Sequence, residues 1–213
     1  MKRPPEIKLY EFPPTRSIRA RWALQELNVP FDSVIVDMRT GAHRSPGFLA
    51  VNPAGKLPAL VDGDTVLTES IAIVLYLCEK YPARCLLPED LAERAQVYRW
   101  LLFTATELEQ PLWRIARHTS MYPESERLPD EVQLARRDFR DMVAVLEAHL
   151  QGRQYLATAA FTAADIVCAY TLDWANEIEL LDACPCTSAY LEAMYRRPDA
   201  PPRISAALAS LSE

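Results

Sequence analysis

The sequence has few glycines, no long hydrophobic run and no excess of basic residues. Only 5 of its 213 residues are glycine, against 17 prolines, which indicates many helices punctuated by proline. No apolar run approaches the ~18 residues of a membrane-spanning helix, so we expect no membrane partner. The net charge of −6 argues against nucleic acid as a main partner.

Several sequence signatures of catalysis and metal binding are also missing. The Gly55-Lys56 pair lacks the first glycine of a phosphate-binding loop at the required spacing, and no Gly-x-Ser-x-Gly motif of the hydrolases occurs. None of the 3 histidines pairs with a second histidine or a cysteine at metal-ligand spacing. The cysteines of Cys184-Pro-Cys186 are separated by one residue rather than the two of a zinc half-site. We therefore expect no metal cofactor.

The 5 cysteines are an odd number in scattered positions. That pattern suits a reducing compartment better than a disulfide framework, so we expect a cytoplasmic protein. Half of the residues are hydrophobic, which provides a sizeable core, and 213 residues suffice for one large domain or two small ones.

The beginning of the chain has the pattern of a βαβ unit. Residues 7–10 alternate as a short strand, residues 18–28 carry apolar side chains at helical spacing, and residues 31–36 form the next strand. Two strands joined through one helix should be parallel, with a right-handed crossover. A short helix near residues 46–51 follows.

The rest of the chain is organised around residues 52–70, which read Asn-Pro-Ala-Gly-Lys-Leu-Pro-Ala-Leu-Val-Asp-Gly-Asp-Thr-Val-Leu-Thr-Glu-Ser. Two apolar runs joined by Asp-Gly-Asp predict a β-hairpin that leads into a helix ending near residue 81. Pro58 cannot donate to a neighbouring strand, which leaves backbone groups of Leu57 facing outward, and a cis bond would turn them into a cleft. Ser70 places a hydroxyl beside unpaired helix N–H groups, a natural seat for a carboxylate. The alternative is an ordinary hairpin before a capped helix.

This stretch resembles the glutathione-binding motif of the soluble glutathione transferases, and the resemblance extends from residue 7 to about residue 202. In that family a Leu/Val-Pro element holds the cysteinyl backbone of glutathione, and a Glu/Gln-Ser element holds its γ-glutamyl carboxylate. A histidine nine residues before Asn52, as in theta- and phi-like members, contacts the glycine carboxylate. The resemblance therefore implies glutathione as co-substrate, bound by His43, Lys56, Leu57, Pro58, Glu69 and Ser70.

The chemistry of such a site depends on the glutathione thiolate, because the thiolate is the nucleophile. Lowering the thiol pKa by about two units means favouring the thiolate by roughly 2.7 kcal/mol. A hydroxyl at the positive end of a helix can supply that stabilisation. Thr15 falls where theta- and phi-like transferases carry their catalytic serine; Ser17 is the second candidate, although it also suits a helix cap, and a backbone N–H is the third. No cysteine lies in residues 13–17, so thiol-exchange chemistry lacks its nucleophile.

The second half of the sequence is helical almost throughout. We expect a helix over residues 91–118 that is kinked at Pro111, a second over residues 130–150, a third after the capping box Thr162–Asp165, and a last one over residues 187–195. The expected fold is an α/β thioredoxin-like domain of order βαβαββα in residues 1–81, a linker in residues 82–90, and an all-α domain in residues 91–213.

The resemblance implies a homodimer that adds glutathione to a small electrophile or displaces its leaving group. Trp113, Arg117 and Tyr122 lie just past Pro111 and are the candidates for the second-substrate pocket, although Trp113 equally suits a core position. Three alternatives stay open: a glutathione-dependent peroxidase, dehalogenase or isomerase of the same fold, a non-catalytic protein-interaction module, and a ligand carrier.

Overall fold

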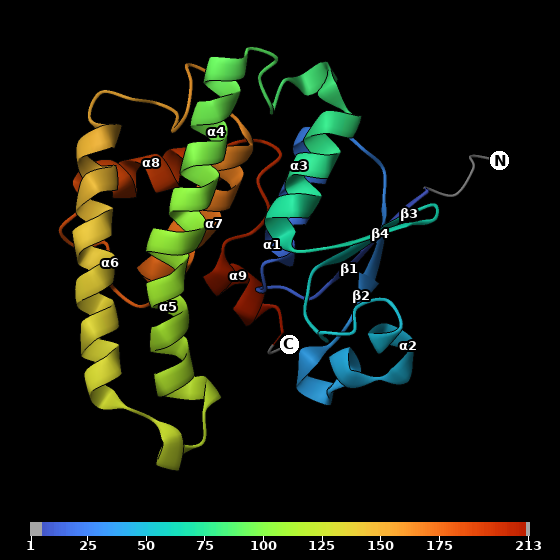
Figure 1. The fold of residues 1–213 in the computed structure, drawn as a ribbon, viewed down its shortest axis with the longest axis horizontal. Coiled ribbons are helices and arrows are strands. Elements are labelled where there is room, and N and C mark those ends of the chain that lie inside the picture. The colour runs from blue at the N-terminus through green and yellow to red at the C-terminus, as the bar shows by residue number, and fades with distance from the viewer. Residues whose placement is uncertain (1–5, 212–213) are drawn as a thin grey trace. The chain divides into compact units, whose positions relative to one another are not determined.

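The computed structural model describes residues 6–211 (Figure 1). The described chain divides into two compact units, the first made of residues 6–87 and 197–211 and the second of residues 88–196. The first unit holds the expected thioredoxin-like arrangement, and the second is all helical.

The first unit is built on a four-stranded mixed sheet of order β2-β1-β3-β4. The strands are β1 (Ile7–Glu11), β2 (Asp32–Ile35), β3 (Ala59–Asp62) and β4 (Thr65–Thr68). β1 and β2 are parallel, as the βαβ pattern predicts, whereas β1–β3 and β3–β4 are antiparallel. The predicted hairpin is thus confirmed.

Helices lie on both faces of this sheet. α1 (Ser17–Glu26) and α3 (Ser70–Lys80) pack side by side along one face (Figure 1). The short α2 (Pro46–Leu49) serves the other face, where the ring of its Phe48 lies 5.9 Å from the ring of Tyr10. Alternate side chains of a strand point to opposite faces, so the neighbouring Leu9 is fully buried on the α1–α3 side.

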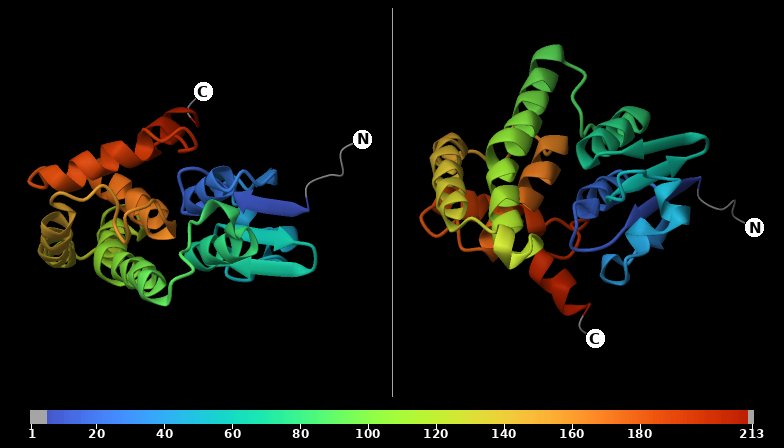
Figure 2. Two further views of the ribbon diagram at one scale, coloured as in Figure 1. Left: turned by 90° about the horizontal axis from the view of Figure 1, so that it is seen from above. Right: turned by 60° about the horizontal axis from the view of Figure 1, so that its bottom comes forward.

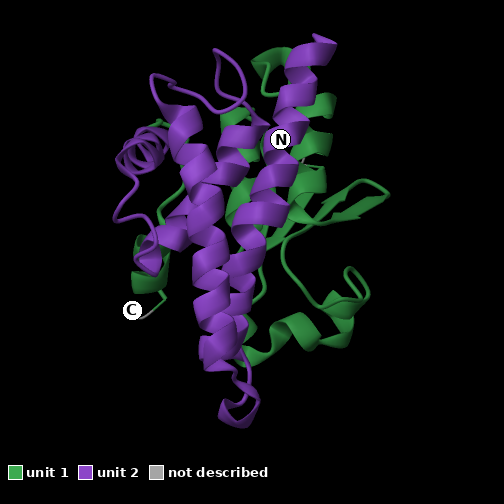
Figure 3. Ribbon diagram, turned by 60° about the vertical axis from the view of Figure 1, so that its left-hand side comes forward, with its two compact units in different colours: residues 1–87, 197–213 green, residues 88–196 purple. Residues whose placement is uncertain are grey.

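The C-terminal segment belongs to the first unit, which corrects the expectation of a helical domain reaching residue 213 (Figure 3). Arg197 donates from Nε and Nη2 to the two carboxylate oxygens of Glu26, at 2.7 and 2.8 Å. Arg39 donates from Nη1 to the Leu211 carbonyl at 2.7 Å. The Glu26 carboxylate is buried and needs a charged partner, and the segment supplies it. This segment also contains a helix that the sequence did not predict, α9 (Ile204–Ala209).

The second unit begins with a long helical run. It comprises α4 (Leu91–Phe103), a π-helical turn (Thr104–Leu108), α5 (Glu109–Ala116) and a second π-helical turn (Arg117–Met121). The sequence predicts a kink at Pro111, and the structure has a π-helical turn that ends at Leu108, three residues before the proline. Pro111 has no N–H to donate, and a wider turn accommodates the missing bond.

The remaining helices of this unit are α6 (Pro129–Leu150), α7 (Ala163–Glu177) and α8 (Pro185–Tyr195). α5 and α6 run side by side in opposite directions (Figures 1 and 2). α7 occupies the centre: of its 15 residues, 12 are buried, so it is covered on all sides. Within residues 6–211 no helix combines the length and the apolar character needed to cross a membrane.

The predicted capping box is present at the start of α7. Asp165 accepts hydrogen bonds from the backbone and hydroxyl of Thr162 on one oxygen, at 2.8 and 3.0 Å. Its other oxygen accepts from the Leu156 N–H and the Tyr190 hydroxyl, both at 2.8 Å. Burial raises the pKa of Asp165, and these four donors act in the opposite direction. One carboxyl group therefore joins a loop, the start of α7 and the middle of α8.

A second acid caps α8 from a different helix. Glu147 of α6 accepts the backbone N–H groups of Cys186 and Thr187, each at 2.8 Å, and the Thr187 hydroxyl at 2.7 Å. Burial alone would raise the pKa of Glu147, but these donors outweigh it and hold the pKa below its ordinary value of 4.5. The N–H groups at a helix start otherwise lack intrahelical partners, so α6 supplies what α8 needs.

The Glu147→Gln variant should make this contribution visible as a pH effect on stability. A carboxyl whose pKa is lower in the folded state stabilises the fold above pH 4.5 and loses that effect as the pH falls through the folded-state pKa. We expect the variant to be less stable than the wild type by about 1–2 kcal/mol at neutral pH. Urea unfolding should show that the difference in free energy of unfolding between the two proteins becomes smaller below pH 4.5. A difference that stays constant with pH would contradict the role of the Glu147 carboxylate as a cap of α8.

Candidate functional site

Two hydroxyl side chains stand between β1 and α1. The Thr15 and Ser17 oxygens lie 2.9 Å apart, and the Ser17 N–H also donates to Thr15 Oγ1 at 3.3 Å. The backbone enters this turn through a cis Pro13–Pro14 bond, and the Thr15 N–H donates to the Phe12 carbonyl at 2.9 Å. The loop is therefore tightly folded around its hydroxyl pair.

The two hydroxyls differ in their exposure. Ser17 is fully buried; its oxygen accepts the Phe12 N–H at 3.2 Å, and its O–H donates to the Phe12 carbonyl at 3.3 Å. Thr15 is half-buried, so part of it reaches the surface. Ser17 is also the first helical residue and Arg16 the N-cap, so the expectation that Ser17 caps the helix is wrong.

The loop before β3 is held from inside by an amide side chain. Asn52 is buried; its Nδ2 donates to the Lys56 carbonyl at 2.7 Å, and its Oδ1 accepts the Ala54 N–H at 3.1 Å. The Leu57–Pro58 bond that follows is cis, the isomer considered in the sequence analysis. The Leu57 side chain is buried in a cluster with Phe12, Val36, Phe48 and Ala59. The Leu57 side chain thus anchors this edge of the sheet.

The loop that carries His43 lies against this one. Gly55 has a φ of +61°, and a Cβ there would lie 2.9 Å from the Arg44 guanidinium and 3.0 Å from the His43 carbonyl. This close approach needs glycine. It brings the half-buried His43 next to the loop of the exposed Lys56. Nδ1 of His43 is enclosed without a partner among residues 6–211, which leaves Nε2 as the ring nitrogen that can reach a ligand.

The start of α3 combines an unusual backbone with a buried cation. Glu69, the N-cap, has a φ of +66° and a ψ of +111°, a conformation that L-residues rarely adopt. The next residue, Ser70, is buried, and its hydroxyl accepts a hydrogen bond from Nη1 of Arg19 at 3.2 Å. Arg19 itself is 1% exposed. Backbone strain of this kind costs about 1–3 kcal/mol and clusters at functional sites.

Sequence reasoning missed Arg19 and Asn52. An arginine in an amphipathic helix normally points to solvent, and nothing in the sequence places this one under α3. Asn52 was identified only as a turn residue, although its side chain organises the whole loop. The structure brings all six predicted glutathione-binding residues and Thr15 into the first unit.

In the second unit, the predicted second-substrate residues lie along the end of the long helical run. The Arg117 guanidinium lies over the Trp113 ring at 6.0 Å, and the Trp113 ring meets Trp174 of α7 edge-on at 5.3 Å. Tyr122 pairs separately with the ring of His118 at 5.1 Å. Trp113 is half-buried, so it is both a packing residue and a surface residue. Trp174 was not predicted.

The neighbouring Arg114 does not contribute a free positive charge to this face. It donates to Glu131 and, at 2.6 Å, to Asp138, both on α6. Arg114 therefore holds α5 against α6. Arg117 is the exposed cation that remains beside Trp113.

Comparison with known proteins agrees with this architecture. Residues 5–79 match the family model "Glutathione S-transferase, N-terminal domain" and residues 108–198 match "Glutathione S-transferase, C-terminal domain". Glutathione S-transferase 3 of Zea mays is 35% identical over 201 residues, which cover 90% of either chain. Glutathione S-transferase GST-4.5 of Xanthomonas campestris is 31% identical over 195 residues, covering 91% of this chain and 95% of that protein.

A solved structure gives the same result at the level of the fold. The glutathione S-transferase from Xylella fastidiosa is 29% identical and aligns with a TM-score of 0.82, covering 97% of this chain and 98% of that one. The chain matches both domains of this family in their usual order, and it matches relatives over nine-tenths of their length. The chain belongs to the glutathione S-transferase family.

Proposed function

We propose that this glutathione transferase binds glutathione on its first unit and holds the thiolate with the hydroxyl of Thr15. The observation that carries the proposal is the hydroxyl pair after β1. Ser17 is enclosed by the backbone of Phe12, whereas Thr15 is half-buried at the start of α1. Of the candidates that the sequence left open, Thr15 is the side-chain hydroxyl that can meet a bound sulfur.

The hydrogen-bond pattern suits a donor role for Thr15. Ser17 Oγ accepts the Phe12 N–H, and its single proton has two acceptors within reach, Thr15 Oγ1 at 2.9 Å and the Phe12 carbonyl at 3.3 Å. When the Ser17 proton is donated to the nearer Thr15 Oγ1, which also accepts the Ser17 N–H, the O–H of Thr15 is left for the sulfur. A hydroxyl that donates to a thiolate favours the charged form and lowers the thiol pKa. The start of α1 adds the positive end of the helix dipole.

The other groups would hold the peptide part of glutathione. Arg19 donates to Ser70 Oγ, so the Ser70 proton and the free N–H groups at the start of α3 can all donate to the γ-glutamyl carboxylate. The strained backbone of Glu69 supports a functional role for this turn. The Leu57 backbone, before Pro58, would pair with the cysteinyl residue. His43 and Lys56 would face the glycine carboxylate.

The bound thiolate then forms a carbon–sulfur bond, either by adding to an electrophilic carbon or by displacing a leaving group that departs with its bonding electrons. In the second unit, Trp113, Arg117 and Tyr122 are assigned to contact the electrophile. Two copies of the chain would form the working homodimer. All five cysteines are free thiols, which fits a reducing compartment such as the cytoplasm.

The experiment that tests this function measures glutathione consumption by the purified protein against a panel of substrates. The panel contains an aryl halide, an α,β-unsaturated carbonyl compound, an organic hydroperoxide and a maleyl-type isomer. Conjugate formation with the first two is the expected outcome. Turnover of the hydroperoxide or the isomer alone would favour the peroxidase or isomerase alternative, and retention on immobilised glutathione without any turnover would favour the binding-module alternative.

The Ser70→Ala variant should weaken glutathione binding without changing the chemical step. Hydrogen bonds to charged groups contribute about 1.5–3 kcal/mol, so we expect the KM for glutathione to rise at least tenfold. The kcat should stay within about threefold, because this contact is made equally in the ground state and the transition state. Ser205→Ala, at an exposed serine of α9, is the matched control. An unchanged KM would remove Ser70 from the binding site.

A further inference from the structure

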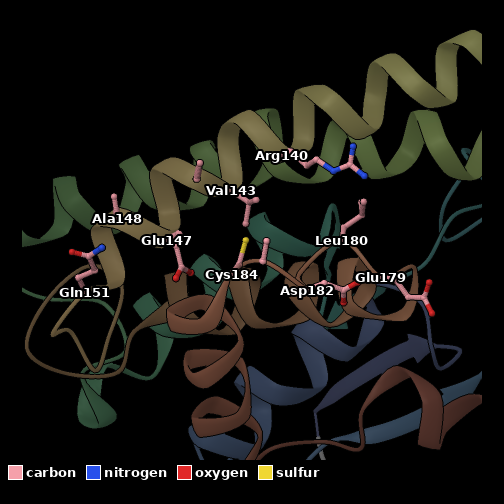
Figure 4. A pocket seen from close by; sticks show the side chains of 11 residues that line it. Arg140, Val143, Glu147, Ala148, Gln151, Glu179, Leu180, Asp182 and Cys184 are labelled. Carbon is pink, nitrogen blue, oxygen red and sulfur yellow. The ribbon is translucent and has the colours of Figure 1, made fainter.

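A cavity of about 630 Å³ lies within the second unit, between α6 and the segment that joins α7 to α8 (Figure 4). Its floor is apolar and well buried: Val143 is 2% exposed, Leu180 5% and Cys184 8%. Pockets of this size with an apolar lining and a few polar groups are typical of small-molecule sites. None of its lining residues has a role in the glutathione site or in the proposed electrophile site.

The Cys184 thiol is directed toward α6 and into this cavity (Figure 4). It forms no hydrogen bond with any residue of the described chain. Burial raises the pKa of Cys184, and the charge of Glu147 raises it further, so the sulfur stays a neutral thiol at physiological pH. A neutral, polarisable sulfur offers a ligand a soft contact surface rather than a nucleophile. Any ligand here is therefore held without a covalent bond.

Charged side chains surround the apolar floor. Glu179 and Asp182 lie on the α7–α8 segment, and Arg140 lies on α6 opposite them (Figure 4). All three are exposed, and none forms an ion pair or hydrogen bond with a residue in the range 6–211. The fourth charged side chain, Glu147, already accepts hydrogen bonds from the N–H groups at the start of α8. Two free carboxylates against one guanidinium leave this rim with a net negative charge.

We propose that this cavity binds a small organic cation with an apolar body. The apolar part would cover Val143, Leu180 and Cys184, and the ammonium group would lie between the free carboxylates of Glu179 and Asp182. An apolar surface alone would accept many ligands, but the uncompensated carboxylates select positive charge. Arg140 opposes such a ligand, so its removal should improve binding. The site is separate from the transferase reaction, and its occupancy does not depend on which hydroxyl activates glutathione.

The test uses two fluorescent probes with the same aromatic group and opposite charge, dansylcadaverine and dansylglycine. Binding is followed by fluorescence with S-hexylglutathione present in excess, so that the glutathione site is filled. The proposal predicts saturable binding of dansylcadaverine, at least tenfold tighter than that of dansylglycine. Salt should weaken this binding, because the carboxylates are exposed. Equal affinity for the two probes, or no saturable binding, would overturn the proposal.

Variants then locate the binding. Exposed carboxylates contribute modestly to the binding of a cation, so the double variant Glu179→Gln/Asp182→Asn should weaken dansylcadaverine binding about tenfold. Arg140→Gln should tighten it about twofold or more. Ala144→Phe fills the cavity from an exposed position on α6 and should abolish it. Glu89→Gln, an exposed acid outside the cavity, is the matched control and should change nothing. Binding that survives Ala144→Phe would place the probe elsewhere and contradict the assignment.

Discussion

Replacing Thr15 with alanine is expected to slow turnover about 100-fold at neutral pH, because removing one donor from a developing or bound anion typically costs 10²- to 10³-fold. The KM for glutathione should change little, since the peptide is held by other groups. The thiol pKa of the bound glutathione should rise toward its value in solution, about 8.5. Steady-state kinetics and a pH titration of the thiolate absorbance of the complex measure both effects.

Two further variants distinguish the effect of the Thr15 hydroxyl from the effects of its methyl group and of the neighbouring Ser17. Thr15→Ser keeps the hydroxyl and removes only a methyl group, so it should retain turnover within about threefold. Ser17→Ala removes a donor to Thr15 Oγ1 and should cause a smaller loss than Thr15→Ala, because Thr15 still reaches the sulfur. Wild-type turnover and an unchanged thiol pKa in Thr15→Ala would assign the role to Ser17 or to a backbone N–H instead.

The Asp165→Asn variant should destabilise the protein more than any other single substitution considered, by about 3–5 kcal/mol. Asp165 is fully buried and all four of its contacts are donors: two from Thr162, one from Leu156 and one from Tyr190. An asparagine turns one of these oxygens into an NH₂ group that faces donors, which leaves buried groups without partners. Thermal unfolding should shift downward by about 10 °C, given about 2–4 °C per kcal/mol for a chain of this size.

Matched variants test whether the loss comes from this network. Tyr190→Phe removes a single donor and should cost about 1 kcal/mol. Asp141→Asn changes an exposed acid on α6 and should have little effect. If Asp165→Asn were no more destabilising than Asp141→Asn, the carboxylate would not be what joins the loop to α7 and α8.

Local patterns account for the parts of the fold that the sequence predicted correctly. The β-hairpin at residues 59–68 depends on an Asp-Gly turn between apolar runs, and the α7 cap depends on a threonine and an aspartate three residues apart. Both signals are complete within a few residues, so they can be recognised without knowing any tertiary contact. The residues proposed to bind glutathione could be named from the sequence for the same reason, because Leu57-Pro58 and Glu69-Ser70 are contiguous motifs; their role stays a prediction.

The features that were missed depend on contacts between distant residues. The C-terminal segment joins the first unit because Arg197 pairs with Glu26, 171 residues earlier in the chain. Arg19 reaches Ser70 across 51 residues, and Glu147 caps α8 across 39. The positive φ of Glu69 could not be predicted from the sequence either. Such a conformation is usually predicted from a glycine, and this position is a glutamate. Only the tertiary structure shows which of these polar side chains are enclosed.

The most direct test of the central claim is the ultraviolet absorbance of thiolate when glutathione is bound to the wild-type protein, followed as a function of pH. Thiolate stabilised by Thr15 and the start of α1 should appear with a pKa about two units below that of free glutathione, near 6.5. Saturable binding with thiolate appearing only near pH 8.5, as in solution, would contradict the proposed role of Thr15. Absence of saturable binding would contradict the glutathione site itself.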